Sequence, residues 1–196
     1  MKKLLTFAMY LILAVTMFAQ NDVTQFLGIP VDGTKSEMIR KLKAKGFTTS
    51  SILDGALEGE FNGQEVYVIP VTNNKKVWRI CVMDKSSKDE GDIKIRFNNL
   101  CNQFENNSKY ISIKDYSISE SEDISYGIGV ENKRYEAAYY QRPMSAGIKP
   151  MFDYTDEDRD KMGKKSVWFM IDKGLMGYRI CMYYDNKYNE ANGDDL

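Results

Sequence analysis

The sequence predicts an α+β fold, in which two amphipathic helices pack against an antiparallel sheet built from helix-plus-hairpin units. Two segments carry apolar residues at helical spacing behind a helix-start signal, and several others have the pattern of strands joined by tight turns. Strands that follow one another through such short turns pair antiparallel. A five-residue pattern also occurs twice in the chain, which raises the hypothesis of a diverged tandem repeat.

The N-terminus has the layout of a secretory signal peptide. Two lysines and an uncharged apolar run that ends at Phe18 precede Ala19 and Gln20. This layout predicts cleavage between Ala19 and Gln20, which leaves residues 20–196 as a single exported domain and residues 1–19 as its signal. The apolar run is too short to cross a bilayer as a permanent helix, and no cysteine near the cleavage point offers a lipid attachment site. We therefore expect no stable membrane anchor and a periplasmic or secreted protein.

The composition excludes several classes of function. The chain has 196 residues, of which 27 are basic and 28 acidic, and 43% are hydrophobic, so a disordered or strongly basic protein is excluded. Lys41, Lys43 and Lys45 share a predicted helix with Glu37 and form no basic stripe, so we expect no nucleic-acid binding. The chain has no histidine, which excludes Ser-His and Cys-His catalytic pairs and the usual zinc sites. The sequence therefore predicts no catalytic residue, no metal ligand and no cofactor.

One helix and three strands are predicted in residues 26–85. Thr34 and Glu37 have the spacing of a capping box, and apolar residues recur behind them at helical intervals until Gly46, which predicts a helix over 35–45. Alternating apolar residues, broken by turns that include Asn62-Gly63, predict strands over 56–62, 65–71 and 77–83. These three strands form an antiparallel meander.

Residues 86–184 are predicted to contain a second helix and a closing hairpin. Ser87 and Glu90 repeat the capping-box spacing, and an apolar stripe that includes Cys101 runs behind them to a helix end near Asn107. The segment that follows, as far as residue 132, matches no single pattern. Residues 134–142 fit a strand or a helix, and their tyrosines favour the strand. The later elements are a loop over 143–164, a hairpin of strands 166–171 and 176–184, and a polar tail over 185–196.

The repeated pattern is aromatic-Arg-Ile-Cys-apolar, at 78–82 and again at 178–182. Each copy is the second strand of a predicted hairpin, and the preceding strands and turns align at the same offset, so the hypothesis is a duplication whose diverged halves are the two segments described above. Cys81 and Cys181 then occupy equivalent positions. Two alternatives follow for this pair: a disulfide, if the hairpins lie side by side, or two small core residues.

Strand alternation and aromatic content bear on which residues face a partner. The two-residue pleat of strand 77–83 places Trp78 on the same side as Ile80 and Val82 and opposite to Arg79. Five aromatic residues on predicted strands have two interpretations, a ligand or protein interface or a packed core. They are Tyr135, Tyr139, Tyr140, Trp168 and Tyr183.

The acidic run at 156–160 alternates carboxylates as a calcium-binding loop does. Lys161 occupies the position that needs glycine and Val167 the position that needs a bidentate glutamate, so we interpret the run as a solvated acidic loop. Paired carboxylates for glycoside hydrolysis depend on their separation in the fold, and the sequence selects no such pair.

Both ends of the expected exported domain resemble known sequences. The segments 26–33, 43–47 and 188–196 resemble uncharacterised exported proteins of Bacteroides-type gut bacteria. The order of a helix followed by a meander is similar, more loosely, to the tandem modules of beta-lactamase inhibitory proteins. This second resemblance concerns architecture, and a shared architecture does not determine function.

Three functional hypotheses follow. The first is a non-enzymatic protein-binding or inhibitor-like module of the cell envelope, whose partner is an envelope or extracellular protein. The alternatives are an extracytoplasmic hydrolase that uses carboxylates and a small-ligand carrier. An exposed aromatic sheet face favours the protein binder, two facing carboxylates in a deep polar pocket favour the enzyme, and a closed apolar cavity favours the carrier. The sequence does not determine the oligomeric state.

Overall fold

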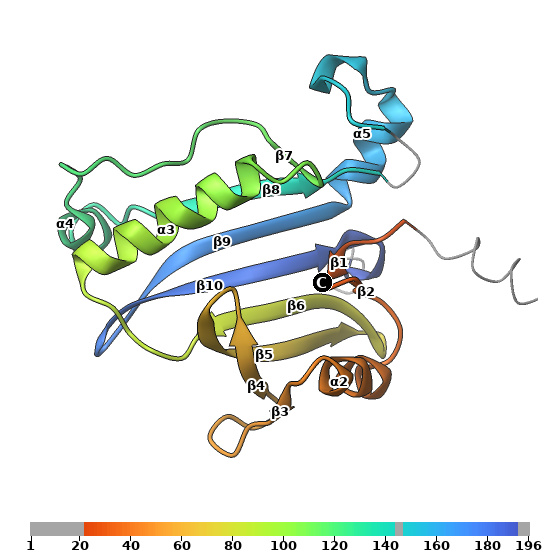
Figure 1. Ribbon diagram of the computed structural model, residues 1–196, viewed down its shortest axis with the longest axis horizontal. Coiled ribbons are helices and arrows are strands. Elements are labelled where there is room, and N and C mark those ends of the chain that lie inside the picture. The colour runs from red at the N-terminus through yellow and green to blue at the C-terminus, as the bar shows by residue number, and fades with distance from the viewer. Residues whose placement is uncertain (1–21, 144–146, 192–196) are drawn as a thin grey trace, which may run out of the picture.

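Helices and strands combine into an α+β architecture, as the sequence predicts (Figure 1). The computed structural model describes residues 22–143 and 147–191. Within them, eight strands form one sheet: β3 (Thr48–Thr49), β4 (Leu57–Phe61), β5 (Gln64–Asn73), β6 (Lys76–Asp84), β7 (Tyr110–Ser112), β8 (Glu136–Gln141), β9 (Lys165–Gly174) and β10 (Gly177–Asn186). A separate hairpin consists of β1 (Gln25–Phe26) and β2 (Ile29–Pro30). The α-helices are α2 (Lys35–Ala44), α3 (Glu90–Glu105), α4 (Ile124–Gly129) and α5 (Asp156–Gly163).

The order of the strands is symmetric about the centre of the sheet. It is β3-β4-β5-β6-β10-β9-β8-β7, and every neighbouring pair is antiparallel. The strands β3 to β6 follow α2, and the strands β7 to β10 follow α3, so each half has a helix ahead of four strands. This is the arrangement that a duplicated unit would give. The duplication itself stays a prediction, because α4 and α5 occur in the second half alone of the described chain.

The two halves meet where β6 pairs with β10. Val82 lies opposite Met182, so two positions that the repeated pattern treats as equivalent face each other across the junction. The register brings the two hairpins side by side, but it pairs Cys81 with Tyr183 and does not pair it with Cys181.

All three cysteines are free thiols in the structure, so the hypothesis of a disulfide between Cys81 and Cys181 is not supported. The register explains the difference, because it offsets the two residues by two positions and makes them diagonal neighbours. Diagonal neighbours lie about 7 Å apart, whereas a disulfide needs Cβ atoms within about 4.5 Å.

The two long helices cover one face of the sheet, which we call the inner face. The helix α2 packs on β5 and β6, and α3 packs on β10 and β9, as Figure 1 shows for α3. Phe97 and Phe104 of α3 contact Phe169 of β9, with ring centroids 5.0 and 5.7 Å apart. The predicted apolar stripe of α3 is buried in full and includes Ile93, Phe97, Leu100, Cys101 and Phe104.

The opposite face of the sheet, which we call the outer face, is covered at one end by α5. There Tyr154 and Met162 pack with Ile111 and Tyr140 in a second, smaller core. Neither α2 nor α3 packs against the rest of this face. Its outward side chains on β5, β6, β8, β9 and β10 include the uncharged residues Tyr67, Ile69, Val71, Cys81, Met83, Ala138, Trp168, Met170, Cys181 and Tyr183, and the charged residues Glu65, Arg79, Glu136, Asp172, Arg179 and Asp185.

The predicted orientation of Trp78 is wrong because β6 contains a β-bulge at this residue. Val71 pairs with Arg79 and Thr72 pairs with Val77, so Trp78 is an extra residue in β6. A bulge of this kind interrupts the alternation of side chains. Val77 and Ile80 are therefore both buried, and Trp78 lies under the guanidinium of Arg79 on the outer face.

Helix boundaries follow the capping chemistry. Thr34 and Glu37 form the predicted capping box at the start of α2. The start of α3 differs from the prediction, because Asp89 rather than Ser87 caps it by accepting a hydrogen bond from the amide of Asp92 at 2.8 Å. Asp89 lies directly before the helix, and aspartate is a preferred residue at this position. The spacing of Ser87 and Glu90 resembles a capping box but does not form one.

Two segments predicted as irregular are regular. The acidic run lies in α5, whose start is fixed by a capping box between Thr155 and Asp158, so the prediction of a loop there is wrong. The predicted polar tail also begins too early, because Asp185 and Asn186 complete β10 and are buried. Asn186 donates a hydrogen bond to the carbonyl of Val31 at 2.7 Å, which explains how a polar residue ends a buried strand.

The predicted signal peptide and its cleavage site at Ala19 and Gln20 lie outside the described residues. None of the helices in residues 22–143 and 147–191 has the length and apolar character of a membrane span. The hairpin β1–β2 is the first element of the described chain. Its Phe26 packs against Tyr184 of β10, with ring centroids 4.8 Å apart.

The turn between β9 and β10 depends on Gly177. Its φ of +120° belongs to glycine, and a Cβ there would lie 2.6 Å from the backbone oxygen of Lys88. We expect Gly177→Ala to lower the free energy of unfolding by about 2 kcal/mol, because both the dihedral and the backbone contact oppose a side chain. Urea unfolding followed by circular dichroism measures this loss. Gly147→Ala is the control, since a Cβ at Gly147 meets nothing within 4 Å; equal stability of the two variants would contradict the assignment.

Candidate functional site

The outer face carries a continuous row of apolar and aromatic side chains across five strands. The register aligns Ile69, Cys81, Tyr183, Trp168 and Ala138, one from each strand. Other outward residues of the same strands lie on both sides of this row, except where α5 covers the ends of β8 and β9. Most of these side chains are partly exposed, so the row is a surface and not an interior layer.

A charged network organises the centre of this row. The guanidinium of Arg79 donates two hydrogen bonds to the carboxylate of Asp185, at 2.6 and 2.7 Å, and the indole Nε1 of Trp168 donates a third at 2.9 Å. The side chain of Asp185 is only 4% exposed, and that of Arg79 is 22% exposed. Burial lowers the pKa of Arg79, but the hydrogen bonds and the charge of Asp185, with smaller contributions from Tyr183 and Glu190, together outweigh it, so the pKa of Arg79 is raised.

Aromatic rings enclose the guanidinium of Arg79. Trp168 and Tyr183 stack with centroids 4.2 Å apart and an interplanar angle of 24°. The guanidinium carbon lies 4.2 Å from the ring centroid of Trp78 and 4.9 Å from that of Tyr183. Cation–π contacts and the bidentate ion pair hold these side chains in one arrangement before any partner arrives. We call Trp78, Arg79, Trp168, Tyr183 and Asp185 the Arg79 cluster.

Two further cations of the outer face are also paired within the chain. Arg179 lies 3.6 Å from Asp172, and Lys85 lies 3.2 Å from Glu58. With Arg79 bound to Asp185, each of these three cations has its own carboxylate. The centre of the face therefore presents aromatic and apolar surface with paired cations, whereas Glu60 and Glu65 at its β4–β5 edge have no ion pair within the described residues.

The outer face also contains two of the three thiols. Burial raises the pKa of Cys81 to about 11 and that of Cys181 to about 12. A nucleophilic cysteine needs the opposite shift, toward a thiolate at neutral pH. These thiols therefore act as apolar surface in the folded protein.

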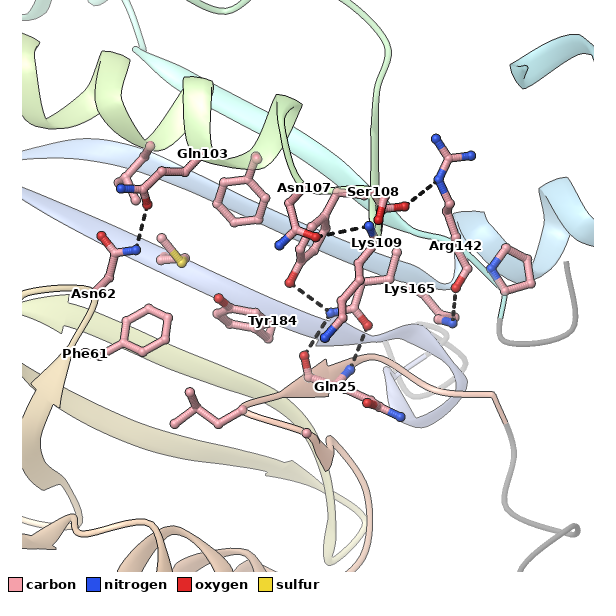
Figure 2. Close-up of a pocket in the computed structure, with 18 of the residues that line it drawn as sticks. Gln25, Phe61, Asn62, Gln103, Asn107, Ser108, Lys109, Arg142, Lys165 and Tyr184 are labelled. Carbon is pink, nitrogen blue, oxygen red and sulfur yellow. Dashed lines mark hydrogen bonds between the residues drawn. The ribbon is translucent and has the colours of Figure 1, made fainter. Parts of the chain in front are cut away.

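The inner face has a pocket, which lies between α3 and the hairpin β1–β2. Its volume is about 690 Å³, within the range of small-molecule sites, and Tyr184 of β10 lies at its floor (Figure 2). Its lining includes three cations and several side-chain amides but no aspartate or glutamate. Paired carboxylates of a hydrolase are therefore not brought together in this pocket. No cluster of potential metal ligands is found in the part of the chain that the structure describes.

The five aromatic residues selected from the sequence divide between the two interpretations. Tyr135 and Tyr139 are buried in the main core, and Tyr140 packs on the smaller one. Trp168 and Tyr183 belong to the Arg79 cluster. Asp185, which organises that cluster, was missed because it stands at the start of a polar run that the sequence indicates as a tail.

Comparisons with known proteins add no relative to this description. No protein-family model, no curated protein and no solved structure matches the chain. The two resemblances noted in the sequence stay expectations. The function proposed below depends on the residues of this chain alone.

Removal of the charge of Asp185 tests the cluster. Asp185→Asn keeps the volume but leaves the half-buried Arg79 without its carboxylate, so we expect the free energy of unfolding to fall by about 2 kcal/mol. The indole of Trp168 should also change its fluorescence, because it loses the charged acceptor. Asp160→Asn is the control, since its ion pair with Lys164 is exposed and should contribute less than about 0.5 kcal/mol. A loss no larger than the control's would show that the pair is not structural.

The raised thiol pKa values predict how stability depends on pH. Unfolded thiols lose their protons near pH 9, whereas Cys81 keeps its proton to about pH 11 and Cys181 to about pH 12. Above about pH 9 and below the pKa values of the folded thiols, the unfolded state binds fewer protons than the folded state. The free energy of unfolding therefore falls as pH rises through this range. Urea midpoints at pH 8 and pH 10.5, in reducing buffer, measure the fall. The double variant Cys81→Ala and Cys181→Ala should lose less; an identical loss would contradict the burial of the thiols.

Proposed function

We propose that the protein is a non-enzymatic, inhibitor-like binding module of the cell envelope, and that it binds a folded protein through its outer face. The Arg79 cluster and its flanking aromatic and methionine side chains support this proposal best. The expected signal peptide supports a periplasmic or secreted location. The partner is then an envelope or extracellular protein.

The residue types of the outer face match those of protein interfaces. Tyrosine, tryptophan, methionine and arginine are enriched at such interfaces, and lysine and glutamate are depleted at their centres. Binding energy concentrates on tryptophan, tyrosine and arginine near the middle of the contact. Trp168, Tyr183 and Arg79 are these three residue types, and they adjoin one another in the middle of the sheet.

Preorganisation adds to the suitability of this surface. A flexible side chain that orders on binding costs about 0.5 to 1.5 kcal/mol. The hydrogen bonds to Asp185 and the ring stacking already fix Arg79 and Trp168 in the free protein. A partner therefore meets a rigid surface.

The pairing of charges indicates the chemistry of the partner. Since Arg79, Lys85 and Arg179 already have carboxylates, a polyanion such as nucleic acid finds no uncompensated cation among these three. The complement is a protein surface of apolar and aromatic side chains. Its binding should depend weakly on salt, because salt mainly screens charges that are not paired.

Site-specific photo-crosslinking tests the proposal. A benzophenone amino acid replaces Tyr67 or Met170 on the outer face, and Asn102, which is exposed on α3, is the matched control position. In intact cells we expect both outer-face positions to give an adduct with the same envelope protein and Asn102 to give none. Equal adducts from Asn102, an adduct with a second copy of the chain, or no adduct from either outer-face position would contradict the proposal.

The partner identified in this way allows a quantitative test. Trp168→Ala should weaken binding by about 30-fold, as expected for a residue at the centre of an interface. An increase from 50 to 300 mM NaCl should change the dissociation constant by less than about threefold. Asp160→Asn, on α5, should leave binding unchanged.

A further inference from the structure

The pocket on the inner face has the properties of a separate small-molecule site. It lies between α3 and the hairpin β1–β2, with the side chains of Met182 and Tyr184 from β10 below it. The main chain of β10 separates it from the outer face, because neighbouring residues of a strand point to opposite sides. Its occupant is therefore not the protein partner proposed above.

Hydrogen bonds between distant segments close the two ends of the pocket. At one end, the amide of Asn62 donates to Gln103 of α3 at 2.7 Å. At the other end, Arg142 donates to the carbonyl of Ser108 at 2.8 Å, and Lys165 donates to the carbonyl of Arg142 at 2.9 Å. These bonds join the walls and form the hollow without a ligand, so the site is preformed.

The floor of the pocket is largely apolar but offers one free hydroxyl. Phe61, Leu100, Phe104 and Met182 contribute apolar surface. Tyr184 is only 5% exposed, and its hydroxyl makes no hydrogen bond within the part of the chain that the structure describes. Because this hydroxyl is accessible from the pocket, a ligand over the floor can bond to it.

The charges of the pocket are of one sign and gather at one end. Figure 2 shows Lys109, Arg142 and Lys165 together, away from Phe61 and Asn62. Lys165 forms an ion pair with Asp22. The described acceptors of the Arg142 guanidinium are two carbonyls and the hydroxyl of Tyr154, none of which is a carboxylate. The ammonium of Lys109 has no ion pair or hydrogen bond within residues 22–143 and 147–191.

From this arrangement we infer that the pocket binds a small amphipathic organic anion, with its apolar body over Tyr184 and its acidic group at Lys109. The guanidinium of Arg142 is held by Ser108, Lys149 and Tyr154, so it adds positive potential to this end without contacting the ligand. Two positive charges without carboxylate partners, in a lining that contains no acid, select the sign of the ligand. The aromatic and aliphatic floor selects an apolar body. The side-chain amides of Gln25, Gln103 and Gln141 at the rim leave room for polar substituents between these two ends.

Two fluorescent probes with one ring system test this inference. 1-Anilinonaphthalene-8-sulfonate carries a sulfonate, and N-phenyl-1-naphthylamine is the same molecule without it. We expect the purified protein to bind one equivalent of the anionic probe at least about threefold more tightly than the neutral probe. The preference should decrease as ionic strength rises.

Variants and chemical-shift mapping locate the probe. Lys109→Gln should weaken the anionic probe by about threefold and leave the neutral probe unchanged, because an exposed charge contributes up to about 1 kcal/mol. Lys43→Gln, an exposed lysine of α2, is the matched control and should change neither. Tyr184→Phe, which keeps the ring, should weaken a probe that bonds to the hydroxyl. The amide shifts of Tyr110 and Gln141 should move and that of Cys81 should not.

Three results would overturn the inference. The first is equal affinity for the two probes, and the second is a Lys109→Gln variant that binds the anionic probe as well as the original chain does. The third is a shift pattern centred on Cys81 and Trp168, which would place the probe on the outer face. None of these results bears on the photo-crosslinking experiment, so the two proposals stand or fall separately.

Discussion

The antiparallel pairing of β6 with β10 is the contact on which the rest of the structure depends. It joins two halves that each have a helix ahead of four strands, and it makes one sheet of eight strands from them. The register at this junction sets which side chains share a face, since a shift of one residue would exchange the two faces. With Val82 opposite Met182, the apolar positions of both strands turn toward α2 and α3 together. The same register carries Arg79 to a position opposite Asp185 on the other side.

The two faces of the sheet have different coverage because only one of them is packed by long helices. The apolar stripes of α2 and α3 bury the inner side chains, and the space between the last turns of α3 and the hairpin β1–β2 remains as the pocket. Most of the outer face has no such cover in the described chain, yet it is not polar. Arg79 and Arg179 are each neutralised by a carboxylate, so aromatic surface around them stays partly exposed without an uncompensated cation. A sheet face of this kind is unusual for a surface that meets only water.

Local signals made the elements of the fold predictable, and long-range register limited the rest. The capping box of Thr34, the turn at Asn62-Gly63 and the stripe of α3 act between residues close in sequence, and the structure confirms each. The bulge at Trp78 arises from pairing with β5, which no pattern within β6 reveals. The helix α5 was missed although Thr155 and Asp158 have capping-box spacing, because the alternating carboxylates favoured a loop. The pocket combines residues from the first and last strands, so sequence order gives no signal for it.

The strand β10 links the two proposed sites through the alternation of its side chains. Tyr183 and Asp185 point to the outer face, and Met182 and Tyr184 between and beside them point to the pocket. Ligands on the two sides are therefore separated by the backbone of one central strand, which is hydrogen-bonded on both edges. A central strand held in this way cannot rotate one side chain toward the opposite face without breaking its ladder. The two proposed ligands would therefore not contact each other, because each meets only the side chains on its own side of β10.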